Sequence, residues 1–148
     1  MSQLAGLKKT WDKYTEGWLG SIIYLVLGFV IAYLFNMGLG FAFNTDTPVV
    51  AVFSDSMVPT FFRGDMILVY GHDEINVGDI IVFDVPDRRY PIIHRVHDMN
   101  EFITTKGDHN SNIDTWKTKK EDIHGKAILK IPLLGWVKIL FVEITGLA

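Results

Sequence analysis

The hydrophobic positions of this chain form one long continuous block followed by many short runs. Residues 17–45 contain no Asp, Glu, Lys or Arg, and the densest part runs from Trp18 to Phe35. A helix rises about 1.5 Å per residue, so roughly 20 apolar residues cross the hydrocarbon layer of a bilayer. The block therefore predicts a retained transmembrane anchor over residues 17–45. A cleaved leader is the alternative, but its apolar core would be shorter, and Gly40–Asn44 makes a poor cleavage site.

The charges beside this block predict its orientation. The N-terminal flank, residues 1–16, carries three lysines against two acidic residues, whereas the C-terminal flank begins with Asp46 and has no Lys or Arg before Arg63. Positively charged flanks stay on the cytoplasmic side of a membrane. We therefore expect residues 1–16 in the cytoplasm and residues 46–148 as a domain outside it.

Beyond the block, short runs of β-branched and aromatic residues alternate with turn residues. We expect strands at Val49–Phe53, Met66–Tyr70, Ile80–Phe83, Ile92–Val96, Phe102–Thr105 and Ala127–Ile131. Such runs, without a long helical period, indicate a mainly β domain. Residues 107–120 are polar and rich in turn formers, so they predict a loop. Two readings of the apolar segment 135–148 stay open: a last strand, or a segment at the membrane surface.

Composition narrows the possible functions. Of the 148 residues, 49% are hydrophobic and 21% charged, which argues against disorder throughout the chain. The net charge of −3 offers no basic excess for a phosphate backbone, so we expect no nucleic-acid partner. The absence of cysteine rules out thiol nucleophiles and thiolate metal sites. The histidine spacings fit no metal-ligand motif, so we expect no metal and no cofactor.

Without thiols, the candidate nucleophiles are hydroxyl groups. A serine needs a neighbouring base to take its proton, and the base needs an orienting partner. Ser56 follows the first expected strand, His94 lies within the fourth, and Asp108 and Asp114 lie in the polar loop. Alone, these residues are weak evidence, because turn serines, strand histidines and loop acids are ordinary. In a regular strand His94 and His97 face opposite sides, so both cannot face one site.

A series of motifs gives these residues a context. In chain order they are Ser54-x-Ser56-Met57-x-Pro59, Arg63-Gly64-Asp65, Val77-Gly78-Asp79, His94-Arg95-Val96 and Lys106-Gly107-Asp108, with Asp114 six residues later. Their order and spacing, behind an apolar anchor, resemble the type I signal peptidases. Bacterial members have a lysine at the position of His94. A histidine there makes the chain similar to the archaeal and endoplasmic-reticulum branch.

The resemblance implies a signal-peptidase-like β catalytic domain behind a single N-terminal transmembrane helix. It implies Ser56 as the nucleophile, His94 as the general base and Asp114 as the residue that orients the histidine. Asp108 is the secondary candidate for that task. In relatives, the residue at the position of Ser54 forms the oxyanion hole together with the backbone amide of the nucleophile.

The resemblance also implies an activity and a location. The expected activity is that of a serine endopeptidase that cleaves signal peptides from secreted preproteins. The catalytic domain would lie on the outer face of the cell membrane, or at the endoplasmic-reticulum membrane in a eukaryote. Secretory preproteins and the lipid membrane are the expected partners, and the translocation machinery is a further candidate.

The surroundings of the nucleophile leave some questions open. Phe53 and Met57 flank it and are candidates for substrate-binding pockets, with a place in the core as the alternative. Asp55 stands where the family often has a small residue, and Val58 stands where glutamate is common. The alternative function is a catalytically inactive membrane-anchored β-domain that acts as a binding module. The retained serine, histidine and aspartate argue against it.

Overall fold

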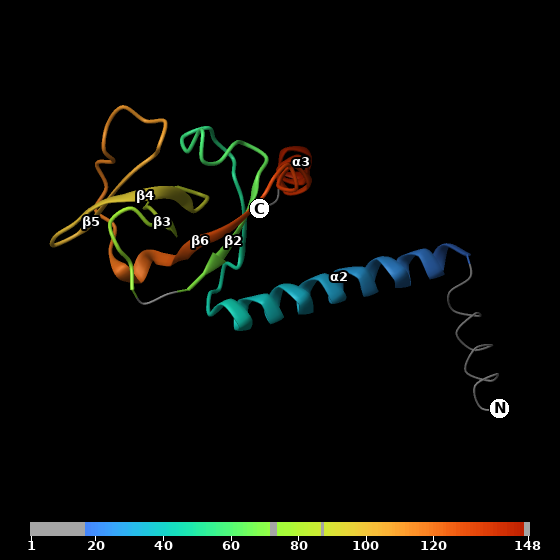
Figure 1. Cartoon of the computed structure of the whole chain (residues 1–148). Helices are drawn as coiled ribbons and strands as arrows, with labels where there is room; N and C mark the ends of the chain where they lie inside the picture. Colours follow the sequence, from blue (N-terminus) through green and yellow to red (C-terminus); the bar gives the residue numbers. More distant parts are fainter. Residues whose placement is uncertain (1–16, 72–73, 87, 147–148) are drawn as a thin grey trace. The chain divides into compact units, whose positions relative to one another are not determined.

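The structure is a computed structural model that describes residues 17–71, 74–86 and 88–146 (Figure 1). The chain divides into two compact units, Met1–Gly38 and Leu39–Ala148. Most of the long helix α2, Gly17–Phe43, belongs to the first unit, and its last turn belongs to the second. The second unit contains all the strands of the described chain.

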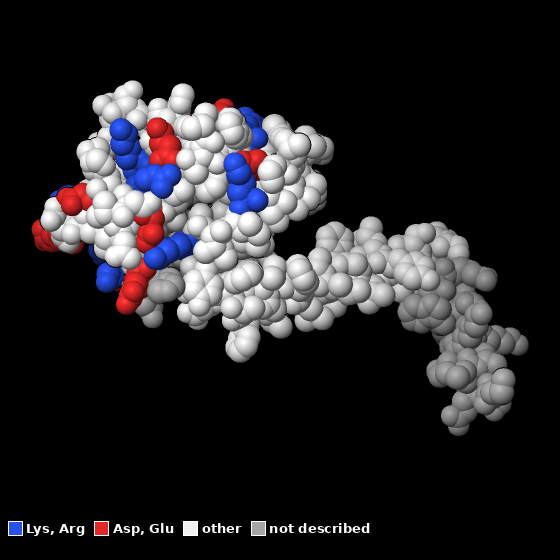
Figure 2. Space-filling view, in the orientation of Figure 1, with Lys and Arg blue, Asp and Glu red and all other residues white. Residues whose placement is uncertain are grey.

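Helix α2 has the length and the composition of a membrane span. It is the one such helix in the described part of the chain, and an 18-residue window of it has a mean hydropathy of 2.2 with no part buried inside the protein. Its 27 residues extend for about 40 Å, which is longer than the hydrocarbon layer. Figure 2 shows the charged side chains gathered on the β unit, with none on α2. The helix ends before Asn44, whose φ of 50° is left-handed.

The second unit is built on one sheet of six strands. The strands are β1 (Val49–Ala51), β2 (Met66–Tyr70), β3 (Ile80–Phe83), β4 (Ile92–Met99), β5 (Ile103–Lys106) and β6 (Ile123–Ile131). Their order in the sheet is β1-β2-β6-β3-β4-β5, and every neighbouring pair is antiparallel. The prediction of a mainly β domain behind an apolar N-terminal helix is confirmed. The central position of β6 joins the two halves of the sheet.

Two clusters of buried apolar side chains form the core. One contains Met57 and Phe61 from the segment after β1, packed with residues of β2, β3 and β4. The other contains Ile81 and Phe83 of β3 together with Val96 and Ile103. The segment that carries Ser56 is therefore anchored in the core by apolar side chains on its C-terminal side.

Four strands and the C-terminal segment differ from the predicted elements, and β5 begins and ends one residue later than predicted. Strand β1 ends at Ala51, two residues early, whereas β4 and β6 are longer than predicted. The prediction of a last strand within residues 135–148 is wrong, because Trp136–Thr145 form the helix α3. Ile139 and Val142, three residues apart, are its buried positions.

The start of α3 packs closely against the turn before β2 at two glycines. A Cβ on Gly64 would lie 2.0 Å from Trp136 Nε1, and a Cβ on Gly135 would lie 2.3 Å from the Asp65 carbonyl oxygen. Gly64 also has a φ of 95°, which a residue with a Cβ rarely adopts. Gly64 is therefore required by close packing and by backbone conformation, whereas Gly135, with a φ of −64°, is required by close packing alone.

Gly64→Ala should destabilise the β unit more than Gly78→Ala. Both glycines have a φ of 95°, so both substitutions incur the left-handed penalty of roughly 1–2 kcal/mol. Only Gly64 faces an indole ring, since nothing lies within 4 Å of a Cβ on Gly78. Overpacking adds roughly 1–3 kcal/mol at Gly64. Thermal unfolding of both variants in detergent measures the difference, and equal losses would contradict the packing argument.

Candidate active site

The turn after β1, which carries the candidate nucleophile Ser56, is held in place by the backbone of the polar loop. The Ser56 carbonyl accepts the backbone N–H of His109 at 2.9 Å. A Cβ on Gly107 would lie 2.6 Å from the same carbonyl oxygen and 2.9 Å from His94 Nε2. Only a residue without a side chain fits between these two groups, which explains the glycine of the Lys106-Gly107-Asp108 motif.

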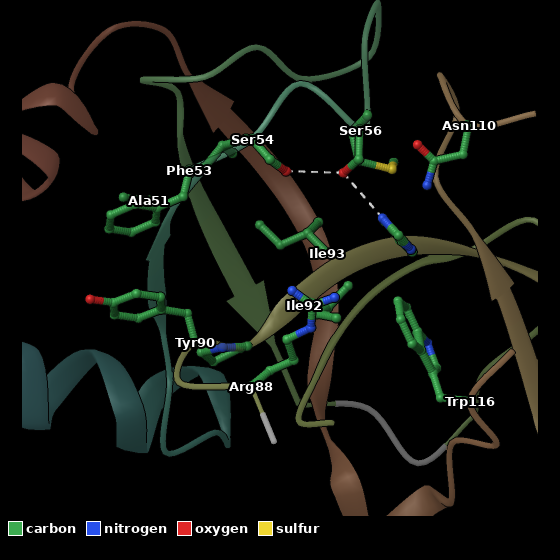
Figure 3. Close-up of a pocket in the computed structure, with 14 residues that line it drawn as sticks. Ala51, Phe53, Ser54, Ser56, Arg88, Tyr90, Ile92, Ile93, Asn110 and Trp116 are labelled. Carbon is green, nitrogen blue, oxygen red and sulfur yellow. Dashed lines mark hydrogen bonds between the residues drawn. The ribbon is translucent and has the colours of Figure 1, made fainter. Parts of the chain in front are cut away.

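Ser56, His94 and Asp114 form a continuous chain of polar contacts. His94 lies on β4 opposite Ile81 of β3, and its side chain is buried. Its Nε2 is 3.1 Å from Ser56 Oγ, and its Nδ1 is 2.5 Å from Asp114 Oδ2 (Figure 3 draws the first of these contacts). The Asp114 side chain is 6% exposed, as is that of His94. An ionised carboxylate only accepts hydrogen bonds, so this geometry puts the imidazole proton on Nδ1 and leaves Nε2 free to accept from Ser56.

Ser54 lies on the other side of the Ser56 hydroxyl. The two Oγ atoms are 3.1 Å apart (Figure 3). Asp55 between them does not face this pair, because its Oδ1 accepts the backbone N–H of Arg63 at 3.3 Å. The carboxylate of Asp55, at a position where the family often has a small residue, is therefore turned away from the two serine hydroxyls.

Asp108 occupies a different environment from Asp114. Both of its oxygens accept hydrogen bonds from Arg95, at 2.8 and 2.7 Å, and Thr60 Oγ1 donates to it at 2.5 Å. The hydrogen bonds from Arg95 are the largest cause that lowers the pKa of Asp108 below its usual range, and the Thr60 bond acts in the same direction. Among the described hydrogen bonds, His94 is bonded to Asp114 and not to Asp108. Asp108 thus connects Thr60, in the segment after Ser56, to Arg95 of β4.

A cavity of about 280 Å³ opens beside Ser56. One wall is the Phe53 ring stacked on Tyr90, with centroids 4.9 Å apart and planes 7° apart. Trp116 lines the cavity next to His94, and its ring stacks on the imidazole with centroids 6.1 Å apart. Met57 also lines the cavity, although its side chain is fully buried in the core.

The structure brings most of the predicted site residues together. Ser54, Ser56, Phe53, Met57 and His94 all line the cavity, and Asp114 contacts His94 behind it. The cavity is also lined by four polar or aromatic residues that belong to none of the sequence motifs: Arg88, Tyr90, Asn110 and Trp116 (Figure 3). Their only sequence signal is proximity, because they lie a few residues from the motifs around His94 and Asp114.

His97 is not part of this site. His94 is buried and His97 is exposed, with a register shift of β4 against β5 between Val96 and Asp98. The opposite placement of the two histidines follows from strand alternation. Within the described ranges, no group of three His, Asp or Glu side chains is placed to hold a metal ion.

Comparison with known proteins agrees with the class that this geometry suggests, a serine peptidase. Residues 33–128 match the family described as Peptidase S24-like. The signal peptidase complex catalytic subunits SEC11 of three Saccharomyces cerevisiae strains (YJM789, RM11-1a and JAY291) are each 35% identical to this chain over 130 residues. The match covers 78% of this chain and 78% of each relative. The chain therefore belongs to the signal peptidase family, which confirms the resemblance to its endoplasmic-reticulum branch.

Asp108→Asn should lower the thermal unfolding midpoint at neutral pH by roughly 5 °C. This shift corresponds to about 1 kcal/mol for a partly exposed ion pair in a domain of this size. The pKa of Asp108 is lowered in the folded state. Its stabilising contribution is therefore complete above the unfolded pKa of about 3.9 and is lost as the pH falls through the lower folded value.

The gap between wild type and Asp108→Asn should therefore close as the pH falls below about 4. Asp98→Asn, at an exposed position on the same strand β4, is the matched control and should show no such gap. A gap for Asp108→Asn that stayed constant down to strongly acidic pH would show that the carboxylate charge does not carry the contribution.

Proposed function

We propose that this chain is a membrane-anchored serine endopeptidase that cleaves signal peptides from secretory preproteins. The observation that carries the proposal is the chain of contacts from Ser56 through His94 to Asp114 at the wall of an open cavity. The name of the yeast relatives, signal peptidase complex catalytic subunit, supports the substrate class. Neither the relatives nor the geometry favours the alternative of an inactive binding module.

In the proposed mechanism Ser56 Oγ attacks the scissile carbonyl carbon while His94 Nε2 takes the hydroxyl proton. The imidazolium then gives this proton to the leaving amine, and a water molecule repeats the sequence to release the acyl group. Asp114 holds the Nδ1 proton and stabilises the imidazolium. The 3.1 Å contact between Nε2 and Oγ is within the range that such a proton transfer needs.

Ser54 and the Ser56 backbone amide are the proposed oxyanion donors. The Ser54 hydroxyl is next to Ser56 Oγ, and therefore close to the region where a bound carbonyl oxygen would develop negative charge. Each such donor contributes roughly 10²–10³ in rate in other serine peptidases. The hydrogen bond from Arg63 N–H to Asp55 supports this role, because it turns the intervening carboxylate away.

The proposed substrate is an extended segment with small residues before the cut. Strand β1 is an edge of the sheet and leads directly into the nucleophile turn, so it can pair with an extended backbone. The stacked Phe53 and Tyr90 rings and the Met57 side chain narrow the cavity, which favours small side chains.

We further propose that α2 anchors the chain in the membrane with residues 46–148 on the outer side and residues 1–16 in the cytoplasm. The supporting observations are the apolar length of α2 and the lysines in its N-terminal flank. The membrane is the cell membrane, or that of the endoplasmic reticulum in a eukaryote. Because the relatives are named as subunits of a complex, further subunits and the translocation machinery are proposed partners.

Ser56→Ala should abolish preprotein cleavage by the full chain in detergent, with a loss of roughly 10⁴-fold or more. His94→Ala should be equally inactive. Asp114→Asn should lower kcat by about 10⁴, because the histidine would then present the wrong tautomer. Ser111→Ala, at an exposed serine of the polar loop, is the matched control and should keep full activity.

The measurement is kcat for each variant beside its unfolding midpoint. Full activity of Ser56→Ala would falsify the nucleophile assignment. If Asp114→Asn kept full activity while His94→Ala lost it, the carboxylate would be dispensable and a simple serine–histidine pair would be the catalytic unit.

The orientation predicts that protease added outside intact cells, or to vesicles with the outer face exposed, digests residues 46–148. The helix α2 should remain protected by the bilayer. A tag at the N-terminus should become accessible only after lysis. Protection of the β unit in intact cells, with digestion after lysis, would reverse the proposed orientation.

A further inference from the structure

Thr105 on β5 contacts the Asp114 residue twice. Its Oγ1 is 2.7 Å from Asp114 Oδ2, and its carbonyl accepts the backbone N–H of Asp114 at 2.9 Å. Thr105 is fully buried, at 0% exposure. Asp114 itself lies in the loop after β5, outside any strand. The carboxylate that meets His94 is thus held from a strand through both the backbone and the side chain of Thr105.

The chemistry of the neighbouring groups determines the direction of the Thr105 hydrogen bond. Trp116 Nε1 lies 3.3 Å from Thr105 Oγ1, and an indole N–H can only donate. The threonine hydroxyl therefore accepts from Trp116, and its single proton points to the carboxylate of Asp114. Asp114 Oδ2 then accepts two hydrogen bonds, one from Thr105 Oγ1 and one from His94 Nδ1.

We propose that Thr105 is a positioning residue for the reaction, acting through Asp114. Its hydroxyl holds the carboxylate in the rotation that accepts Nδ1–H, so that His94 Nε2 faces Ser56. Trp116 completes the unit, because the same side chain donates to Thr105 and stacks its ring on His94. This inference rests on the proposed function, since it assigns a role within the same catalytic chain.

Among the described residues, a second buried threonine, Thr118, makes no hydrogen bond to Asp114 and serves as a structural control. Thr118 is 3% exposed, and its backbone bonds to Ile103 of β5, two residues before Thr105. Its Oγ1 is buried without a hydrogen-bond partner among the described residues. Valine has nearly the shape of threonine, so Thr118→Val removes a hydroxyl from the same region without touching Asp114. It is the matched control for Thr105→Val.

The experiment compares Thr105→Val, Thr105→Ser, Thr118→Val and Ser56→Ala in the full chain in detergent, with a secretory preprotein as substrate. Thr105→Val should lower kcat by about 10- to 100-fold, the range expected for a lost hydrogen bond to a charged group, and leave KM unchanged. Thr105→Ser keeps the hydroxyl and should restore most of kcat. Thr118→Val should match wild type.

A second readout needs no substrate. The His94 Nδ1 proton, bonded to a carboxylate at 2.5 Å, should give a low-field ¹H NMR resonance. Thr105→Val should shift or broaden this resonance, whereas Thr118→Val and Thr105→Ser should not. This signal reports the position of Asp114 and would not respond to a general loss of stability shared by both valine variants.

The outcomes separate this inference from the proposed function. Loss of activity in Ser56→Ala, with wild-type kcat and an unshifted resonance in Thr105→Val, would overturn the role of Thr105 and leave the proposed function intact. Activity retained by Ser56→Ala would overturn the proposed function and the positioning role of Thr105 with it. Equal losses in Thr105→Val and Thr118→Val would assign Thr105 to packing alone.

Discussion

The carbonyl of Ser56 accepts the backbone N–H of His109, and this contact closes the polar loop against the turn that carries Ser56. The site depends on that closure, because the turn and the loop come from opposite ends of the sheet order. Ser56 follows β1 at one edge, and Asp114 follows β5 at the other. Gly107 makes the close approach possible, since a side chain there would collide with the Ser56 carbonyl and the His94 ring. Backbone contacts of the turn and the loop thus set the distances between the side chains of the site.

Two carboxylates of one loop serve this closure in different ways. Asp108 is paired with Arg95 and bonded by Thr60, so its charge is neutralised by a guanidinium at the outer side of β4. Among the described residues, the Asp114 carboxylate accepts hydrogen bonds from His94 and from the neutral hydroxyl of Thr105. A carboxylate whose oxygens already accept hydrogen bonds from an arginine has little acceptor capacity left for a histidine. The separation of the two acids therefore leaves one for structure and one for the histidine.

The sequence predicts the strands and the long apolar helix well because each has a strong local pattern. The six strand positions follow from short β-branched runs between turn residues, and α2 follows from its lack of charge. Helix α3 was missed because its buried contacts reduce to Ile139 and Val142, and exposed apolar residues surround them. The choice between Asp108 and Asp114 also lay beyond local pattern. It depends on strand alternation, which turns Arg95 away from His94, and on a loop path that no short motif encodes. The Phe53–Tyr90 stack is likewise a long-range contact without a periodic signal.

The short connection after α2 has a geometric consequence for the proposed enzyme. Helix α2 ends at Phe43 and β1 begins at Val49, so five residues at about 3.5 Å each give a reach of at most roughly 17 Å. A hydrogen bond from the Gly71 N–H to the Phe43 carbonyl, at 2.8 Å, restricts the connection further. If α2 crosses the bilayer as proposed, this connection limits how far the start of β1 can lie from the end of the helix. In the proposed enzyme, the short connection would then restrict cleavage by the distance of a peptide bond from the lipid as well as by the side chains that flank it.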